Sequence, residues 1–308
     1  MESAFLDDFT SDNRRYFYPV CGKVAIFAPS NNDNGKMKMK RLLTLATLLI
    51  IYGSSIQAKD YTVASPNGKN VVRVTDDLRL IVSHGDREVF TVKADLEVLN
   101  IPRRKVRASS EEKPSFIRGL GFARQQMIDE RMEAPFYRQS TLQAEGRQMD
   151  IRLNGGFGLH VRAYDEGVAY RFYTTRKKET AIANETAAFS FPTDSKCWLA
   201  YSTNDEKPFA MAFQNYYDET TLSQAQDKLV FLPATIQSGD VKVTILESDL
   251  RNYPGMFLKT SGTSGFPELS GYTLRANFAH YPKKMAYYPW RGMSYVEETE
   301  DYIAKSTG

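Results

Sequence analysis

The chain has 308 residues, with 40 lysines and arginines against 37 aspartates and glutamates, three histidines and two cysteines. Hydrophobic residues make up 42% and charged residues 25%, a composition that is typical of a folded protein and excludes disorder over most of the length. Residues 1–58 carry seven of the basic and five of the acidic residues, which leaves 33 and 32 in the body. A body so close to neutral lacks the concentrated basic face of a nucleic-acid-binding protein, so no nucleic-acid partner is expected.

Residues 37–58 have the composition of an export signal. A basic stretch, 37–41, precedes eleven largely apolar residues, 42–52, and then small residues that end at Ala58. Eleven helical residues are too few to cross a bilayer core about 30 Å thick. We therefore expect a signal peptide that is cleaved after Ala58, export to the bacterial periplasm or beyond, and no stable membrane anchor after cleavage.

Residues 1–36 precede this signal, whereas an export signal stands at the start of the chain that carries it. We therefore expect translation to begin at Met37 or Met39, and residues 1–36 to be a spurious extension of the reading frame. Cys21 then lies outside the mature chain, and Cys197 alone cannot form an intramolecular disulfide. The apolar stretch around Cys197 favours a small buried side chain over a reactive thiol.

From residue 59 onward, short runs alternate between apolar and polar side chains, as half-buried strands do. Such strands are expected at residues 78–82, 159–164, 168–173 and 241–245. Turn sequences rich in Pro, Asn and Gly occur at 66–68, 154–156 and 253–255. Helical periodicity is scarce, with residues 218–229 as the best candidate. The pattern predicts an all-β fold, a large antiparallel β-sandwich with few helices.

The motifs of common catalytic and cofactor sites are missing from the sequence. The stretch 119–121 lacks the third glycine of a dinucleotide-binding turn, and neither a P-loop nor a Gly-x-Ser-x-Gly sequence occurs. The three histidines do not have the spacing of zinc ligands. Aromatic clusters at 213–217 and 287–290 suit stacking on sugars, although packing on a sheet is the commoner role of such side chains. From the residues alone, the function stays open.

Residues 159–172, with the sequence LHVRAYDEGVAYRF, resemble the N-terminal domain of glycoside hydrolase family 97, the exported bacterial α-glucosidases and α-galactosidases. Further segments resemble that domain in the same order, at residues 61–68, 189–198, 246–256 and 301–308. The resemblance implies one domain over residues 59–308, a large antiparallel sandwich of the kind shared with galactose mutarotases. In the family this domain packs on a (β/α)8 barrel.

The resemblance also implies that the catalytic part lies outside this sequence. The barrel carries the acid and base of the family and takes about 250 residues, so no catalytic residue carries over. Gly308 stands just before the family's Pro-Trp-Arg strand, and we expect the last strand of the domain to be missing. The expected function is to support the carbohydrate site of an exported retaining or inverting α-glycosidase that acts on α-linked oligosaccharides through the barrel. By itself the chain is expected to be inactive.

One functional residue carries over by resemblance. In the glucosidase branch, the N-terminal domain gives a calcium ion at the active site a carboxylate that lies shortly after a landmark tryptophan. Trp198 matches the tryptophan and Glu206 matches the acid, at a spacing one residue shorter. Since calcium takes six to eight oxygen ligands, Glu206 is expected to bind it only within the full-length enzyme. The alternative is an ordinary glutamate on a surface loop.

Two other functions stay open at this point. A standalone carbohydrate-binding protein can reuse the same domain, and tight glycan binding by the purified chain would favour it. A mutarotase-like sugar epimerase needs a histidine and a glutamate in one cleft, such as His160 or His280 with Glu247. That alternative rests on the fold class alone, and fold does not confer function.

Overall fold

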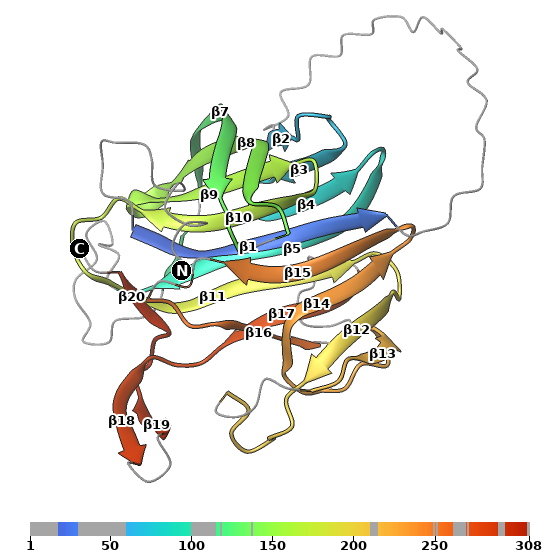
Figure 1. Cartoon of the computed structure of the whole chain (residues 1–308). Coiled ribbons are helices and arrows are strands. Elements are labelled where there is room, and N and C mark those ends of the chain that lie inside the picture. Colours follow the sequence, from blue (N-terminus) through green and yellow to red (C-terminus); the bar gives the residue numbers. More distant parts are fainter. Residues whose placement is uncertain are drawn as a thin grey trace, which may run out of the picture.

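The computed structural model describes residues 18–29, 60–99, 115–117, 119–136, 138–209, 215–248, 250, 252–260, 269, 271–288 and 293–306 (Figure 1). These residues contain twenty β-strands, one 3₁₀ turn at Asn154–Gly156 and no α-helix. Eighteen strands belong to one antiparallel sheet that folds into two facing layers, and the hairpin of β18 and β19 stands apart. The prediction of an all-β antiparallel sandwich is confirmed.

The first layer has the spatial order β7-β8-β9-β10-β1-β15-β14-β12-β13. Its strands are β1 (Tyr18–Pro29), β7 (Leu120–Glu133), β8 (Thr141–Leu153), β9 (Phe157–Tyr164), β10 (Gly167–Thr174), β12 (Lys196–Tyr201), β13 (Asp218–Thr221), β14 (Val230–Ser238) and β15 (Val241–Ser248). Within this layer, β7 to β10 form a simple meander in which each strand pairs with the next along the chain.

The second layer has the order β16-β17-β11-β5-β4-β3-β2, with β6 beside β5 and β20 beside β11. Its strands are β2 (Tyr61–Ala64), β3 (Asn70–Val74), β4 (Arg79–His84), β5 (Arg87–Val98), β6 (Ser115–Phe116), β11 (Thr180–Phe191), β16 (Met256–Thr260), β17 (Tyr272–Phe278) and β20 (Ala304–Ser306). A pairing of Val230 in β14 with Leu258 in β16 joins the two layers at one side. The separate hairpin of β18 (Pro282–Tyr288) and β19 (Met293–Thr299) projects from the body (lower left of Figure 1).

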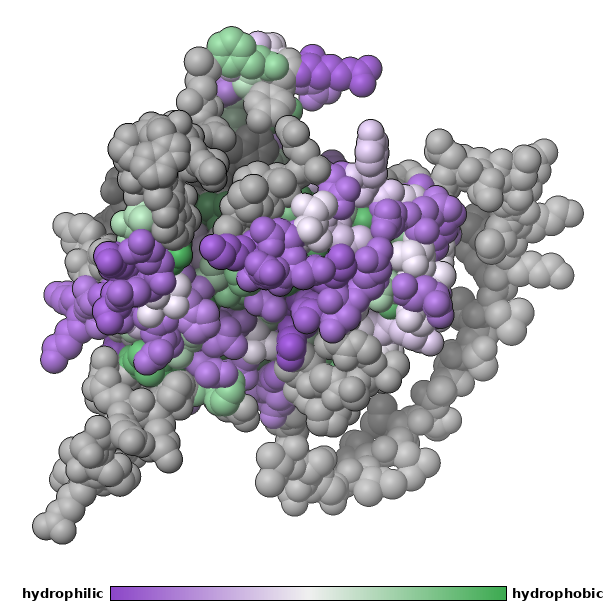
Figure 2. Space-filling model, turned by 90° about the horizontal axis from the view of Figure 1, so that it is seen from below, coloured by the Kyte–Doolittle hydropathy of each residue, from purple (hydrophilic) through white to green (hydrophobic). Residues whose placement is uncertain are grey.

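The core lies between the facing layers, where β2 and β3 pack over β8, β9 and β10. Hydrophilic side chains dominate the described part of the surface in Figure 2. Leu159 and Phe172 enter it from the first layer and Leu80 from the second, each no more than 2% exposed. The rings of Phe90 and Phe191 pack with centroids 5.8 Å apart. Because burying one such side chain contributes about 1.5–3 kcal/mol, this continuous cluster is the main source of the stability of the sandwich.

The strands and turns read from the sequence are found in the structure. The four alternating runs lie in β4, β9, β10 and β15, and the three turn sequences lie between strands. At the first turn, Gly68 has a φ of +73° and its N–H donates to the carbonyl of Ser65 at 2.9 Å. Glycine adopts that backbone conformation without a steric penalty, which is why the turn sequence is informative.

The prediction of a helix at residues 218–229 is wrong. Residues 218–221 form β13, and Trp198 on β12 is the register partner of Glu219 and donates its indole N–H to the Glu219 carboxylate at 2.9 Å. Next, the N–H of Leu222 donates to the carbonyl of Ser195 at 3.0 Å. Backbone groups that a helix would pair internally are thus satisfied by the sheet, and tertiary pairing overrides a weak local preference.

Several expectations concern residues that the structure does not describe, among them the export signal at 37–58. Residues 18–29, within the segment expected to be a spurious extension, form β1 and pair along both edges of that strand. The start of the natural chain stays a prediction. Within the described ranges, no helix has the length and apolar character to cross a bilayer.

Candidate functional site

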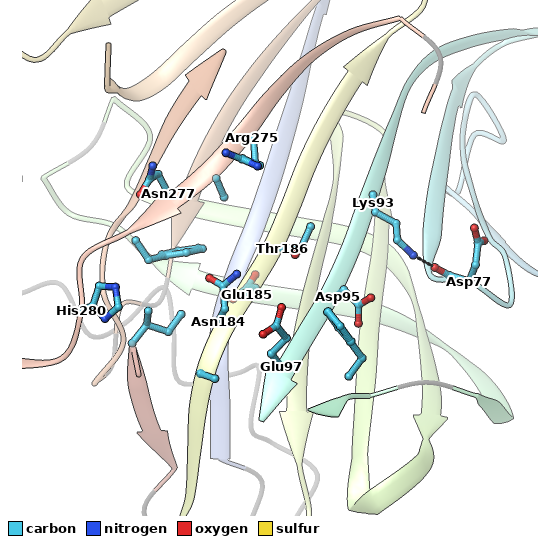
Figure 3. A pocket seen from close by; sticks show the side chains of 15 residues that line it. Asp77, Lys93, Asp95, Glu97, Asn184, Glu185, Thr186, Arg275, Asn277 and His280 are labelled. Atoms are coloured by element: carbon cyan, nitrogen blue, oxygen red, sulfur yellow. Dashed lines mark hydrogen bonds between the residues drawn. The ribbon is translucent and has the colours of Figure 1, made fainter. Parts of the chain in front are cut away.

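A pocket of about 790 Å³ lies over β5, β11 and β17 on the outer face of the second layer (Figure 3). Alternation along β5 builds its floor: Lys93, Asp95 and Glu97 face the pocket, while Val92 and Leu96 are buried in the core. The strand therefore carries charge on one face and apolar side chains on the other, as its period of two requires.

The side chains that line the pocket suit a ligand with many hydroxyl groups. Four acidic and two basic residues line it, together with two asparagines, a histidine and two phenylalanines: Asp77, Asp95, Glu97, Glu185, Lys93, Arg275, Asn184, Asn277, His280, Phe116 and Phe278. Its volume is within the usual range of ligand sites, about 300–1,000 Å³. Carboxylates and amides accept and donate hydrogen bonds to hydroxyls, and rings pack on apolar faces.

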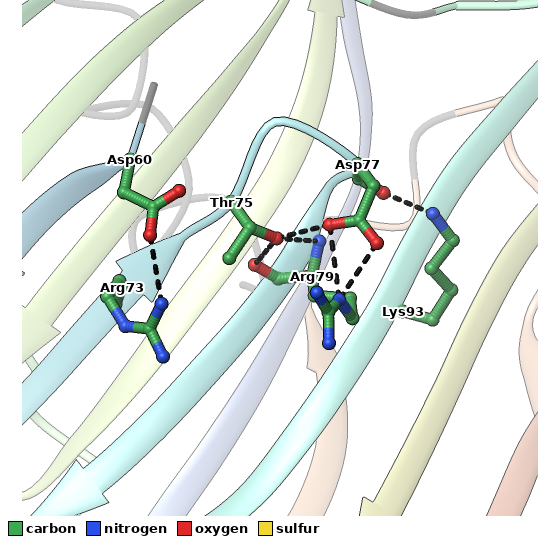
Figure 4. A network of polar contacts seen from close by, with 6 residues as sticks. All are labelled: Asp60, Arg73, Thr75, Asp77, Arg79 and Lys93. Atoms are coloured by element: carbon green, nitrogen blue, oxygen red, sulfur yellow. Dashed lines mark hydrogen bonds and ion pairs between the residues drawn. The ribbon is translucent and has the colours of Figure 1, made fainter. Parts of the chain in front are cut away.

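The turn between β3 and β4 places Asp77 at one rim of the pocket (Figure 3), and Figure 4 shows the polar contacts of this turn. Leu78 in this turn has a φ of 61°, which the neighbouring contacts stabilise. The hydroxyl of Thr75 donates to the Asp77 carboxylate at 2.5 Å, and Nε of Arg79 donates to it at 2.8 Å. Lys93 donates its ammonium hydrogen to the Asp77 carbonyl, which ties the rim to the floor.

Two of the acids that line this pocket have different surroundings. Burial raises the pKa of Asp77, but the hydrogen bond from Thr75 and the charges of Arg79 and Lys93 outweigh it, and the net pKa is lowered. Glu185 is 2% exposed and accepts a hydrogen bond of 2.6 Å from the hydroxyl of Tyr253. Asp77 is thus held ionised at neutral pH, as a fixed negative charge at the rim.

A second polar cluster lies on the outer face of the first layer, where β8, β9 and β10 run side by side. Asp150 and His160 are register partners, and the Nδ1–H of neutral His160 donates to the Asp150 carboxylate. Gln148 donates to that carboxylate at 2.6 Å and accepts from Nε of Arg162 at 2.7 Å. The Tyr173 ring stacks on His160 with centroids 4.1 Å apart. This cluster is a continuous hydrogen-bond network on the face opposite the core.

Burial controls the protonation of this cluster. Loss of solvent lowers the pKa of His160 below its usual value, against the opposing effect of the Asp150 carboxylate. Burial raises the pKa of Asp150, but the hydrogen bond and charge of His160 more than offset this, and the net pKa is lowered. At neutral pH the pair is therefore a neutral imidazole that donates to a carboxylate, which is a structural contact between strands.

Glu206 lies on the loop that follows β12, and its side chain is exposed. Its N–H donates to Oδ1 of Asn204 at 3.1 Å, and Asp205 beside it forms an ion pair of 3.3 Å with Lys228. Within the described ranges, no three His, Cys, Asp or Glu side chains are grouped as a metal site. One exposed carboxylate does not supply the six to eight oxygens of calcium. The described residues do not fit a calcium ion by themselves.

The residues considered for an epimerase each have other partners in the structure. His160 is bound to Asp150 on β8, and Glu247 on β15 accepts the N–H of Met256 at 2.8 Å. His280 lines the pocket on the second layer, with Nδ1 at 3.0 Å from the Glu300 carbonyl. His160 and Glu247 thus lie on different strands, and His280 lies in the connection between β17 and β18.

Other residues singled out from the sequence have simple roles. Cys197 is buried, and burial raises the pKa of its thiol to about 12, so it is a small core side chain as expected. Of the aromatic cluster at 213–217, Tyr216 is 90% exposed, and the hydroxyl of Tyr217 donates to the Pro233 carbonyl at 3.1 Å. Neither tyrosine is among the residues that line the pocket.

The pocket itself was not predicted from the sequence. A signal exists in β5, where Lys93, Asp95 and Glu97 alternate with apolar residues, and again in Arg275 and Asn277 of β17. However, β5 and β17 lie on either side of β11, and the sequence does not show that strands so distant along the chain become near neighbours.

A family model described as "Glycosyl-hydrolase 97 N-terminal" matches residues 63–307. The chain belongs to this family. A retaining α-galactosidase of Bacteroides thetaiotaomicron is 31% identical to this family 97 domain over 281 residues, which are 87% of the chain and 39% of that protein. A probable retaining α-galactosidase of Streptomyces bingchenggensis is 27% identical over 224 residues, 66% of the chain and 31% of that protein. The chain spans less than two fifths of each of these curated relatives.

Solved structures share the fold of this family 97 domain. A glycoside hydrolase family 97 enzyme from Pseudoalteromonas sp. strain K8, in complex with acarbose, superposes with a TM-score of 0.54 and 16% identity over 80% of this chain and 34% of that one. A β-arabinopyranosidase superposes with a TM-score of 0.57 and 18% identity over 72% of this chain and 36% of that one. The resemblance drawn from five short sequence segments is confirmed.

Proposed function

We propose that this family 97 domain is the N-terminal part of an exported retaining α-galactosidase, where it supports the carbohydrate site of a catalytic domain elsewhere in the longer protein. The observation that carries the proposal is the family match together with its two curated relatives, both named as retaining α-galactosidases and both more than twice as long as the matched region. The substrates are then α-linked galactosides. By itself the domain has no turnover.

The rigid sandwich is suited to this supporting role. A continuous core holds the strands in place, so the loops at the strand ends are presented in a fixed geometry. Glu206 lies on such a loop, directly after β12. We propose that it supplies one carboxylate to a calcium site whose other ligands belong to the catalytic domain. When bound there, calcium would orient sugar hydroxyls.

The test of the proposed function begins with the gene. Beyond the codon for Gly308, one of the three forward reading frames is expected to encode a (β/α)8 domain. The absence of such a domain from all three frames would contradict the supporting role. The protein from the joined gene is expected to hydrolyse 4-nitrophenyl α-galactoside faster than 4-nitrophenyl α-glucoside. A preference for the glucoside would overturn the substrate class while leaving the supporting role intact.

Carbohydrate binding by the domain alone is a second candidate, because the polar pocket has the size and chemistry for a sugar. Calorimetry of the purified chain with galactose and melibiose measures this directly. Arg275→Ala removes a cation from the pocket and is expected to abolish any such binding. Lys242→Ala, on β15 of the other layer, is the matched control. Binding that Arg275→Ala does not weaken would exclude the pocket.

Export is also proposed, on the sequence of residues 37–58. N-terminal sequencing of the natural protein is expected to begin at Lys59, directly after Ala58. A mature protein that begins upstream of Met37 would show that this segment is not a cleaved signal.

A further inference from the structure

Strand β1 occupies an unusual position in the sheet, because it is inserted between two strands that come much later in the chain (Figure 1, blue). On one side it pairs with β10 and on the other with β15, antiparallel to both. Residues 22–26 have register partners on both sides at once: Val24, for example, lies opposite Ala169 and Leu246. Its backbone is therefore held along both edges.

Without β1, the first layer would divide in two. One part would be the meander from β7 to β10, and the other would be β15 with β14, β12 and β13. Both new edges would lie over the core, since every residue of β10 is buried and Val243 and Ile245 of β15 are fully buried. A row of unpaired N–H and C=O groups in that place is costly, so the gap requires a strand.

Residues 18–29 have the sequence of a strand suited to such a gap. Between Pro19 and Pro29 the segment contains three β-branched residues, Val20, Val24 and Ile26, and these favour extended backbone. Proline has no N–H to donate and is therefore placed at strand ends rather than in a paired centre. Pro19 and Pro29 stand near the two ends of the paired segment, where a missing N–H removes no hydrogen bond from its centre.

Main-chain pairing along both edges holds β1 in the sheet. Thirty residues, 30–59, separate it from the next described residue, Asp60, and the cleavage expected after Ala58 falls within them. Binding by main-chain pairing to two open edges is the same physics by which extended peptides add to sheets.

We propose that the gap between β10 and β15 is a strand-acceptor site, and that residues 18–29 bind in it as a separable strand, with or without an intact segment 30–59. The ligand class is an extended peptide that pairs antiparallel on both edges. This inference does not depend on the proposed glycosidase activity. It applies to a chain that contains residues 18–29, and a chain translated from Met37 would leave the acceptor site open.

Hydrogen–deuterium exchange on the full chain tests the pairing. Val24→Pro removes one backbone donor at the centre of β1, and Val24→Ala is the matched control that keeps it. Relative to the control, amides of residues 168–173 and 241–246 are expected to exchange about tenfold faster or more, because their partner strand opens locally. Those of β3 and β4, in the other layer, keep their protection. Equal exchange in the two variants at β10 and β15 would overturn the proposal.

A second measurement covers the case in which Val24→Pro unfolds the whole chain. A specific protease site is inserted after Asn34 in the otherwise unchanged full chain, and the cut protein is passed over a sizing column. The N-terminal peptide is expected to elute with the body, and a labelled synthetic peptide of residues 16–31 is expected to replace it. Elution of the peptide apart from the body would show that the strand is not held by the acceptor site and would overturn the proposal.

Discussion

His160 is 8% exposed and donates to Asp150 across two strands, so its titration is coupled to folding. Because burial lowers its pKa from the usual 6.5, the unfolded chain binds this proton more readily than the folded chain. Stability from this residue is therefore complete above about pH 6.5 and is lost as the pH falls through that value toward the lower folded pKa.

The free energy of unfolding is accordingly expected to fall between pH 7.5 and pH 5.5, and His160→Asn should remove most of that fall. Urea unfolding of both proteins at the two pH values measures it. His280→Asn, outside the cluster, serves as the control. An unchanged pH dependence in His160→Asn would contradict the assignment.

The turn at the rim of the pocket depends on one carboxylate. Asp77 accepts hydrogen bonds from Thr75 and Arg79, whereas its neighbour Asp76 is exposed. Asp77→Ala is expected to lower the free energy of unfolding by about 1 kcal/mol, since the ion pair is partly exposed and screened. Asp76→Ala removes the same charge and should change it by less than about 0.5 kcal/mol. Similar losses in the two variants would refute the role of the turn contacts.

Calcium binding tests the role of Glu206. The chain alone is expected to show no calcium site tighter than about 1 mM, because one exposed carboxylate leaves most of the six to eight ligand positions to water. In the full-length enzyme, Glu206→Gln is expected to weaken calcium binding, and Glu179→Gln, on the loop before β11, should not. A sub-micromolar site in the chain alone would rule out a site shared between domains.

Among elements, the strands were predictable and their neighbours were not. Alternation identifies β9 and β10 in the sequence because both present apolar residues to the core every second position. It fails at residues 218–229, where a cross-strand pair with Trp198 determines the conformation. Pairings between distant strands, such as β5 with β11 beneath the pocket, depend on the packing of the whole sheet. The sequence therefore predicts the strands, but it does not predict which strands meet to form the pocket.

Gly271 determines how the chain enters β17. It has a φ of +109°, and a Cβ there would lie 2.1 Å from the Phe191 carbonyl oxygen. Gly68 also has a positive φ, +73°, but nothing lies within 4 Å of its Cβ position. Gly68→Ala is thus expected to cost about 1–2 kcal/mol from backbone strain alone. Gly271→Ala must cost more, because the backbone of β11 has to move, and denaturant unfolding compares the two. Equal losses would show that the close approach has no energetic weight.

At the scale of the whole molecule, exposed apolar side chains gather on the hairpin that borders the first layer. Phe122 is 69% and Met127 is 64% exposed on β7, and Phe136 at its tip is 76% exposed. Because β7 is the last described strand on that side of the layer, its apolar side chains lie beside an open edge, which promotes association between copies. The purified chain is therefore expected to aggregate at high concentration.

Two substitutions should separate this aggregation from stability. Phe122→Ser with Phe136→Ser removes exposed rings and should raise the concentration at which light scattering begins, while the midpoint of thermal unfolding moves by only a few degrees. Ile128→Ser, on the same strand but 5% exposed, should instead lower that midpoint, since it removes a buried side chain. If the double variant aggregates like the natural sequence, the hairpin is not the associating surface. The edges of β10 and β15 that flank β1 are then the next candidates, because both would open if β1 left the sheet.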